Sequence, residues 1–131
     1  KANIGFSFKK GCERPMAVYA DKEKIQQVVY NLIDNAIKYG KTDGHIVASI
    51  YTTDENTVLT EISDNGIGIP EQYLNRIFER FYRTSGGRNK DVRGSGLGLA
   101  ICKDIIEAHG HTIHVRSKED VGTTIGFTLD R

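Results

Sequence analysis

The chain has 131 residues, of which 38% are hydrophobic and 27% charged, proportions ordinary for a globular domain with one core. Its formal net charge of +1 gives no argument for a nucleic acid or an anionic membrane surface as partner. No apolar run approaches the roughly 18 residues that a membrane-spanning helix needs. Cys12 and Cys102 lack metal-ligand spacing, and Cys102 lies in an apolar helical pattern typical of a buried, reduced thiol.

The first forty residues predict strands followed by one long helix. Apolar residues alternate over residues 3–8, which indicates a strand, and a further short strand is expected at 16–20. Asp21 is placed to cap the N-terminus of the helix. The helix is expected to run to about Tyr39 and to end at Gly40, because glycine readily adopts the left-handed conformation that closes a helix.

A hairpin and a short helix are predicted in the middle of the chain. Residues 45–53 and 57–63 are rich in β-branched side chains, and the polar residues 54–56 between them suit a turn. Pro70 fits the first turn of a helix at 70–78, because a proline lacks only an N–H that would be unpaired there.

The last part of the chain predicts a mobile loop, a third helix and a strand pair. Residues 84–95 contain little apolar matter and are expected to form the loop. An apolar helical pattern follows at 96–109, closed by Gly110. Strands are expected at 112–117 and 123–129. This order of elements predicts an α/β sandwich, in which helices cover one sheet, and a single domain over the whole chain.

One helix face carries polar side chains that an ordinary amphipathic helix does not need. Asn31, Asn35 and Lys38 are spaced i, i+4 and i+7 and therefore share one face. Asparagine is unfavourable inside helices, because its side chain competes for backbone hydrogen bonds. Polar surface is one explanation. Amide oxygens beside a cation also suit Mg²⁺ bound to a polyphosphate.

Two glycine clusters favour the second explanation. Residues 64–70 (Asp-Asn-Gly-Ile-Gly-Ile-Pro) follow a predicted strand, where glycines permit a ligand to approach the backbone and Asp64 offers an acceptor to an exocyclic amine. Residues 93–99 (Arg-Gly-Ser-Gly-Leu-Gly-Leu) open a predicted helix, whose free N–H groups favour an anion. Taken singly, each cluster is also explained as a turn or a flexible loop end.

Five motifs occur in one order along the chain: residues 31–39, 64–70, 77–83, 94–99 and 122–124. They resemble the N, G1, F and G2 boxes and the terminal Gly-Thr element of the catalytic ATP-binding domain of bacterial sensor histidine kinases, here of the PhoR-like type. That domain belongs to the wider ATP-binding family of gyrase, Hsp90, MutL and histidine kinases. The resemblance implies the Bergerat fold, a mixed sheet of about five strands covered on one face by three helices.

At the phosphate end, the resemblance implies a site for ATP and Mg²⁺. Asn35 and Asn31 would be the metal ligands, and Lys38 and Arg83 would contact phosphates. Asn31, Lys38 and Arg83 would thus be the catalytic residues. Tyr39 would meet the sugar–phosphate edge of the nucleotide. The triphosphate would be flanked by the second glycine cluster: Gly94, Ser95, Gly96, Leu97 and Gly98.

At the adenine end, the resemblance implies that Asp64 accepts a hydrogen bond from the adenine amine. Gly66 and Gly68 would admit the base, Ile69 would lie against it, and Thr123 would support Asp64 through water. Residues 79–95 would form an ATP lid hinged on two aromatic residues, Phe78 and Phe81.

The same resemblance separates a kinase from a hydrolase. Hydrolysing members of the family place a glutamate where this chain has Asn31, and an amide cannot deprotonate water. The expected activity is therefore transfer of the γ-phosphoryl group to a histidine outside the chain, because none of its histidines lies in a phosphoacceptor motif. An ATPase or clamp of the same fold and an anti-sigma-type serine kinase are the alternatives.

The resemblance also implies partners and a location. The chain would be a monomeric cytoplasmic fragment of a homodimeric parent that is anchored in the bacterial cell membrane. Its partners would be the parent's own dimerisation and phosphotransfer domain and a downstream response regulator, with no nucleic acid.

Overall fold

The computed structural model of the chain describes residues 5–8, 18, 20–38, 43–54, 56–79 and 98–130, with the backbone alone described at 5–8 and 75. Eight elements follow one another in these ranges: β1 (Gly5–Phe8), α1 (Lys22–Lys38), β2 (His45–Asp54), β3 (Thr57–Asp64), η1 (Glu71–Arg76), α2 (Gly98–Ala108), β4 (Ile113–Lys118) and β5 (Gly122–Asp130).

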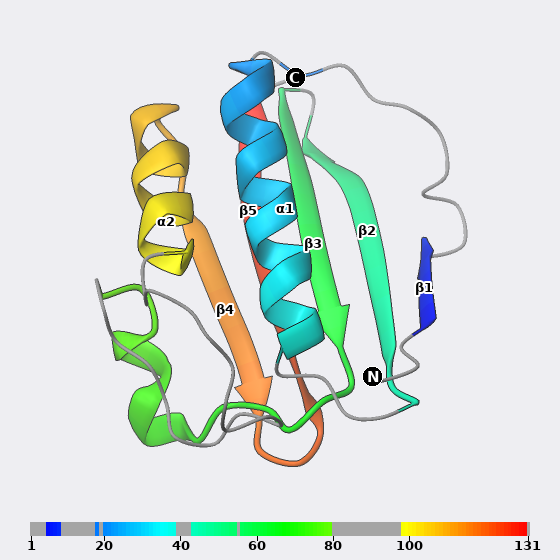
Figure 1. The fold of residues 1–131 in the computed structure, drawn as a ribbon. Coiled ribbons are helices and arrows are strands. Elements are labelled where there is room, and N and C mark those ends of the chain that lie inside the picture. The colour runs from blue at the N-terminus through cyan, green and yellow to red at the C-terminus, as the bar shows by residue number, and fades with distance from the viewer. Residues whose placement is uncertain are drawn as a thin grey trace.

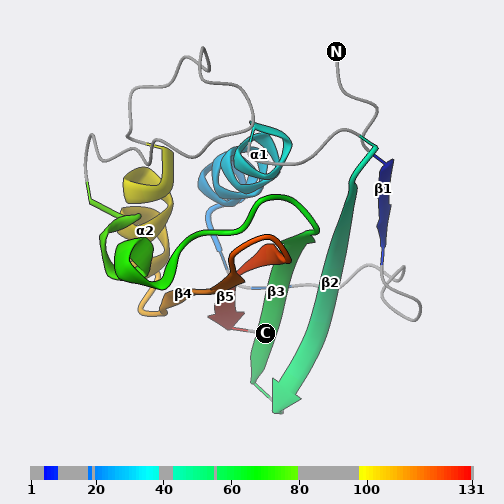
Figure 2. The same cartoon turned by 90° about the horizontal axis from the view of Figure 1, so that it is seen from below.

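The strands form one mixed sheet of five strands in the order β1-β2-β3-β5-β4. β1 runs parallel to β2, whereas the other three strand pairs are antiparallel. Both α-helices lie side by side on one face of the sheet (Figure 1), and the view from below shows the two layers edge-on (Figure 2). The predicted two-layer α/β sandwich with about five strands is therefore confirmed.

The helical layer differs from the prediction of three helices. The helix expected at 70–78 is a short 3-10 helix, η1, which contacts β4. Pro70 precedes it, and the bond from the Tyr73 N–H to the Pro70 carbonyl spans three residues, as in 3-10 geometry. The segment is too short to cover the sheet, so two α-helices form the layer in the described part of the chain. None of the described helices has the length and apolar character required to cross a bilayer.

The core lies between the helices and the sheet. Val28, Leu32 and Ala36 recur at i, i+4 and i+8 along α1, and they form the buried stripe of that helix. α2 contributes its own stripe, and alternate residues of β2, β3 and β5 face both helices. The buried residues of α2 and the sheet that join this cluster are Cys102, Ile105, Ile106, Ile46, Ala48, Ile62, Ile125, Phe127 and Leu129.

Local signals set the helix ends as predicted. The Asp21 carboxylate accepts a hydrogen bond from the Lys24 N–H at 3.1 Å and thereby caps α1. Gly110, two residues after the end of α2, adopts a positive φ of 78°, as the closing residue of a helix commonly does. The short strand expected at 16–20 is wrong where it can be checked, because Val18 and Ala20 lie outside any strand and pack against the core. Gly40 lies outside the described residues.

Candidate functional site

The polar face of α1 lies against the start of α2. The Asn31 amide donates a hydrogen bond to the Gly98 carbonyl, with 3.4 Å between the nitrogen and the oxygen. The same amide hydrogen-bonds to the Cys102 thiol, which in turn lies 3.7 Å from the Val28 carbonyl. Burial raises the pKa of the Cys102 thiol to about 11, against a smaller opposing effect of the Asn31 amide. The predicted buried thiol is confirmed, and Asn31 links the two helices.

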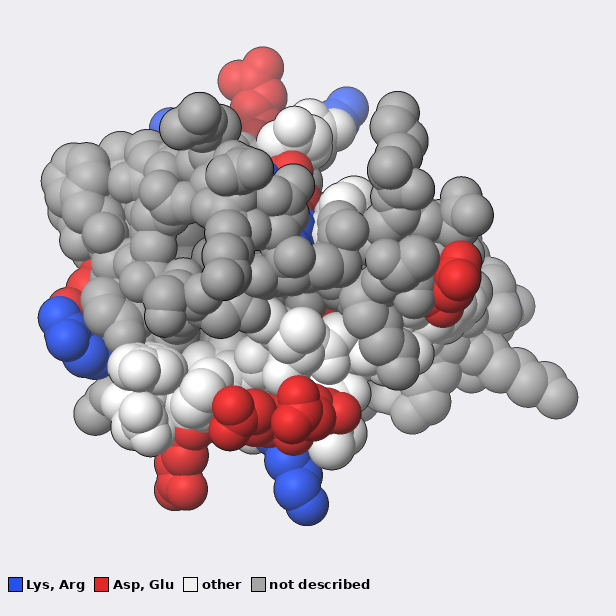
Figure 3. Space-filling model, turned by 60° about the horizontal axis from the view of Figure 1, so that its bottom comes forward, with Lys and Arg blue, Asp and Glu red and all other residues white. Residues whose placement is uncertain are grey.

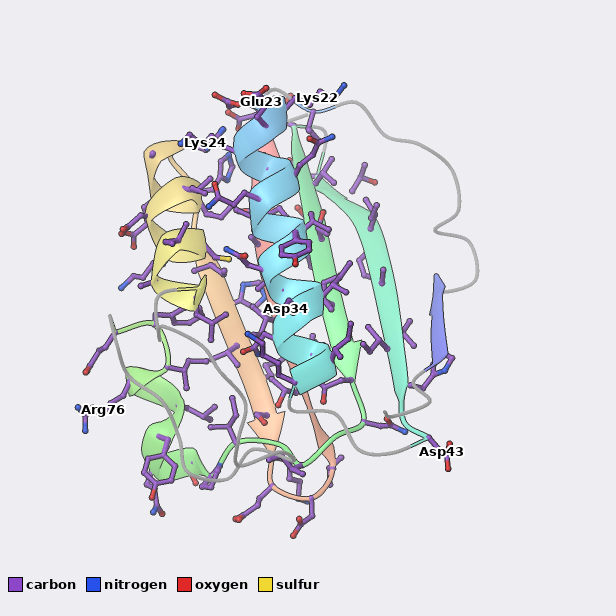
Figure 4. All side chains as sticks on the ribbon, in the orientation of Figure 1. Lys22, Glu23, Lys24, Asp34, Asp43 and Arg76 are labelled. Atoms are coloured by element: carbon purple, nitrogen blue, oxygen red, sulfur yellow. The ribbon has the colours of Figure 1, made fainter. Side chains whose placement is uncertain are left out.

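Asn35 and Lys38 continue this face by one and two turns. Asn35 is half-buried, and its amide has no hydrogen-bond partner among the described residues. The Lys38 ammonium lies 3.0 Å from the Asp34 carboxylate, an i,i+4 pair whose side chains are 33% and 39% exposed. Figure 4 labels Asp34 on α1. Pairs of this kind contribute only about 0.3–0.5 kcal/mol, so Lys38 can exchange Asp34 for a phosphate at little cost. Asp34 was not assigned a role from sequence, although its i,i+4 spacing from Lys38 is a usable signal.

Asp64 ends β3 on the face of the sheet that carries the core. Its backbone pairs with the buried residue Ile46 on one side and with Thr123 on the other. The carboxylate accepts a hydrogen bond from the Gly66 N–H at 2.9 Å and another from the Thr123 N–H. Burial raises the pKa of Asp64 and outweighs these two hydrogen bonds, which lower it. A carboxylate has about four acceptor positions, so Asp64 retains capacity for an external donor.

Thr123 lies beside Asp64 across the β3–β5 pairing, and the expected contact through water stays a prediction. Its backbone N–H contacts the carboxylate directly. Its hydroxyl bonds to the Ser117 hydroxyl at 2.8 Å, and its side chain is buried. The pairing of β3 with β5 therefore orients Asp64 without an intervening group.

The loop after Asp64 is fixed by contacts on both sides. The Asn65 side chain accepts a hydrogen bond from the His45 N–H at 2.6 Å, which ties the loop to the start of β2. On the other side, the Asp120 N–H donates to the Ile67 carbonyl at 2.7 Å, and the Ile69 N–H donates to the Ser117 hydroxyl at 2.7 Å. Neither Asn65 nor Ser117 was assigned a role from sequence. Ser117 was detectable as a polar residue at a core-facing position of an alternating strand.

Gly68 is required by the fold itself. Its φ is +71°, and a Cβ added there would lie 2.1 Å from the Lys118 carbonyl oxygen. Packing against the end of β4 already excludes a side chain at position 68. The fold therefore accounts for this glycine without the expected role in admitting a base. Gly66 is buried and donates to Asp64, so its N–H serves the carboxylate.

The β4–β5 turn and the C-terminal end of α1, which both lie at the lower end of the molecule in Figure 1, carry side chains of different charge. Glu119 and Asp120 are exposed in the turn between β4 and β5, and acidic side chains gather at this end of the molecule (Figure 3). Lys38 lies at the end of α1 instead. An anionic group would be repelled by the acidic turn and attracted by the ammonium.

Of the remaining predicted site residues, some belong to the part of the chain that the structure describes and others do not. Phe78 packs against the core beside η1, and Gly98 begins α2 with open space around its Cα. The other members lie outside the described residues: Tyr39, Phe81, Arg83, Gly94, Ser95, Gly96 and Leu97. Within the described ranges, no group of three or more His, Cys, Asp or Glu side chains could hold a metal ion. A cation bound here would rely on the amide oxygens of Asn31 and Asn35 together with ligand oxygens and water, which is a ligand set that Mg²⁺ accepts.

The described histidines beyond β2 have structural partners. His109 Nδ1 lies 2.8 Å from the Ile105 carbonyl, and its Nε2 accepts the Asp21 N–H at 3.0 Å, so the ring connects the end of α2 to the start of α1. His111 bonds to Thr128 and Asp130 at 2.9 and 2.8 Å. These contacts give both histidines structural roles.

Comparison with known proteins gives one family. Residues 20–131 match the family described as "Histidine kinase-, DNA gyrase B-, and HSP90-like ATPase". The chain is 44% identical over 118 residues to the sensor histidine kinase WalK of Bacillus subtilis (strain 168), a stretch that is 89% of this chain and 19% of WalK. It is 45% identical over 112 residues to the adaptive-response sensory kinase SasA of Rippkaea orientalis, covering 86% of this chain and 28% of SasA. The chain thus spans 19% to 28% of the length of these relatives.

A solved structure shows the same fold over nearly the whole chain. The mycobacterial sensor histidine kinase MprB superposes with a TM-score of 0.85 at 33% identity, covering 97% of this chain and 83% of that one.

Proposed function

Because the chain belongs to the histidine kinase-, DNA gyrase B- and HSP90-like ATPase family, we propose that it is the catalytic domain of an ATP-dependent sensor histidine kinase. It binds Mg-ATP and transfers the γ-phosphoryl group to a histidine on a dimerisation domain. The observation that carries this proposal is the half-buried Asp64 carboxylate, held by two backbone N–H groups with acceptor capacity left over.

Asp64 selects adenine in this proposal. The exocyclic amine of adenine donates to the free acceptor positions of the carboxylate. Guanine presents a carbonyl oxygen at the same place, which would leave a partly buried carboxylate without a donor. Ile69 lies against the base, and Gly66 and Thr123 keep the carboxylate oriented through their N–H groups.

The phosphates lie along α1. Asn35 is the preferred Mg²⁺ ligand, because its amide is not engaged by any described residue, whereas the Asn31 amide already donates to Gly98. Asn31 retains its carbonyl oxygen for the metal or its water. When bound, Mg²⁺ neutralises phosphate charge and helps to position the γ-phosphoryl group. Lys38 leaves its exposed pair with Asp34 and contacts a phosphate oxygen.

The other roles rest on motif position. Tyr39 meets the sugar–phosphate edge, and residues 79–95 form the ATP lid, with Phe78 and Phe81 as hinges. Arg83 reaches the phosphates when the lid closes. The glycine cluster that leads into Gly98 supplies backbone N–H groups at the start of α2, where the helix dipole favours negative charge. These glycine-cluster residues are Gly94, Ser95, Gly96, Leu97 and Gly98.

Asn31 favours phosphotransfer over hydrolysis. A general base at its position would deprotonate water, which an amide cannot do at neutral pH. Its amide hydrogen is moreover committed to the Gly98 carbonyl. Bound ATP is therefore held for an external nucleophile.

The parent protein supplies that nucleophile in this proposal. Its dimerisation domain carries the phosphoacceptor histidine, the parent is a homodimer anchored in the cell membrane, and a response regulator receives the phosphoryl group. Support for the last partner comes from ThkA, a histidine kinase solved in complex with the response regulator protein TrrA. The PhoR-like subtype and the monomeric state of the chain by itself stay predictions.

The test is reconstituted phosphotransfer. The chain is mixed with the separately expressed dimerisation domain of its parent, Mg²⁺ and ATP radiolabelled at the γ-phosphate. Label should appear on the dimerisation domain in acid-labile, base-stable form, as phosphohistidine. Asn35→Ala should abolish transfer, whereas Gln26→Ala, on the exposed face of the same helix, should not change it. Label on a histidine of this chain, acid-stable label, or steady ATP hydrolysis without transfer would each contradict the proposal.

A further inference from the structure

Ser117 occupies a core-facing position near the end of β4. Val115 and Ile113, two and four residues earlier, both pack against the core. Side chains alternate along a strand, so Ser117 continues the same row. A hydroxyl at such a position requires partners, because burying it without a hydrogen bond is costly.

Its hydroxyl has three partners, one in the loop that follows Asp64 and two at the start of β5. It accepts the Ile69 N–H at 2.7 Å, donates to the Gly122 carbonyl at 3.0 Å and lies 2.8 Å from the Thr123 hydroxyl. The bond to Ile69 crosses 48 positions of sequence. One oxygen atom thus joins β4, the start of β5 and the loop that follows Asp64.

Two of these partners belong to the walls of the proposed adenine site. Ile69 is the residue expected against the face of the base, and Ser117 fixes its backbone directly. Thr123 donates its N–H to the Asp64 carboxylate, and Ser117 holds the hydroxyl of the same threonine. Ser117 therefore contacts both the residue expected against the face of the base, Ile69, and the residue that holds the carboxylate expected at its edge, Thr123.

The backbone around Ser117 interlocks with the same loop. A Cβ on Gly68 would lie 2.1 Å from the Lys118 carbonyl oxygen, and one on Gly122 would lie 2.1 Å from the Asp64 carbonyl oxygen. The Asp120 N–H also donates to the Ile67 carbonyl at 2.7 Å. The loop and the turn between β4 and β5 therefore fit as one unit, with the Ser117 hydroxyl as its side-chain hydrogen-bonding centre.

We propose that Ser117 is a positioning residue for adenine recognition, which holds Ile69 and, through Thr123, Asp64 in the geometry that accepts the base. This inference rests on the proposed function. Without the hydroxyl, the Ile69 N–H and the Thr123 hydroxyl lose their partner in a partly buried setting, and the loop must move to find others.

The sheet offers a matched control. Ser63 and Thr124 form another hydroxyl pair between β3 and β5, also at 2.8 Å and also partly buried. Both residues directly neighbour Asp64 and Thr123 in sequence, so their side chains point to the opposite face of the sheet. Ser63→Ala removes a comparable hydrogen bond without touching the loop.

The experiment compares Ser117→Ala, Ser117→Thr and Ser63→Ala. Calorimetric titration with ATP and with ADP is run at a temperature at which thermal melts show every variant to be folded. Ser117→Ala should weaken both nucleotides by the same factor, about 5- to 10-fold for one or two lost hydrogen bonds. Ser117→Thr, which keeps the hydroxyl, should restore affinity. Ser63→Ala should lower the melting temperature without changing either affinity.

A second readout needs no nucleotide. In amide NMR spectra of the free protein, Ser117→Ala should shift the Ile69 and Gly66 amide signals and accelerate hydrogen exchange at Ile69. Ser63→Ala should leave these signals in place.

The outcomes separate the two proposals. Unchanged nucleotide affinity in a folded Ser117→Ala protein, or an equal loss of affinity in Ser63→Ala, would overturn the role of Ser117. Failure of the unsubstituted protein to bind ATP would instead overturn the proposed function. In that case the Ile69 amide NMR signal would still show whether Ser117 holds the loop. An unchanged Ile69 signal in Ser117→Ala would overturn that role as well.

Discussion

Asp64→Asn tests the proposed adenine site most directly. The substitution keeps the shape of the side chain and replaces one acceptor oxygen by an NH₂ donor. In the structure, the carboxylate already accepts the N–H groups of Gly66 and Thr123. An asparagine has one acceptor atom. If its oxygen accepts the backbone N–H groups, its NH₂ group faces the adenine amine, and two donors meet. If its oxygen faces the adenine amine, its NH₂ group faces the backbone N–H groups, and donors again meet donors.

The size of the effect follows from this conflict. A hydrogen bond to a charged acceptor contributes about 1.5–3 kcal/mol, and about 1.4 kcal/mol corresponds to tenfold in affinity. The variant should therefore bind ATP about 10- to 100-fold more weakly.

Stability should change in the opposite direction. Burial raises the folded-state pKa of Asp64 above its ordinary value of 3.8. A group with a raised folded-state pKa makes its full contribution to the free energy of unfolding below the unfolded-state pKa. This contribution is lost as the pH rises through the folded-state pKa. At neutral pH the ionised Asp64 therefore costs stability, and a neutral asparagine removes this cost. Asp64→Asn should melt at a higher temperature at pH 7 without nucleotide.

The assay combines titration calorimetry with thermal melts between pH 4 and pH 8. ATP affinity of the unsubstituted protein should decline as the pH falls towards the raised pKa of Asp64, and the variant should lack this part of the pH dependence. Asp54→Asn is the matched control, because Asp54 also accepts an N–H two residues ahead, from Asn56 at 2.8 Å, but is exposed. Unaltered ATP affinity in Asp64→Asn, or an equal loss in Asp54→Asn, would refute the reasoning.

Three further substitutions test other parts of the structure. The pKa of Cys102 is raised from 9.0 to about 11, so between pH 9 and pH 11 the free energy of unfolding should fall by up to about 2–3 kcal/mol. Cys102→Val should lack this loss in chemical denaturation, and identical pH profiles would contradict the burial. Gly68→Ala should destabilise the fold by roughly 2–5 kcal/mol, because positive φ and a clash with backbone combine. Gly110→Ala, with positive φ but open space, should cost about 1–2 kcal/mol in the same measurement, and equal losses would exclude the clash. Lys38→Met should weaken ATP binding about 10-fold, as a lost charge-assisted contact does, with stability changed by less than about 0.5 kcal/mol. Asp34→Asn frees the ammonium, so a loss of ATP affinity in that variant would contradict the assigned role.

Local patterns predicted most of the elements. The capping carboxylate of Asp21 and the apolar spacing behind it located the start of α1 correctly. The β-branched runs located β2 and β3 equally well. The helix expected at 70–78 became a 3-10 helix, because a six-residue segment after Pro70 has too few helical hydrogen bonds to outweigh its contacts with β4.

The sequence by itself determined which chemical groups the proposed site contains, because motif order and spacing along α1 and after β3 are local properties of the chain. Asn31, Asn35 and Lys38 share a face through helical periodicity alone. Only the tertiary structure decided how these groups are held. The pairing of β3 with β5 places the Thr123 N–H on Asp64, and β4 brings the Ser117 hydroxyl to Ile69 from 48 residues away. Hydrogen bonds between distant segments depend on sheet order and register, which no local pattern specifies.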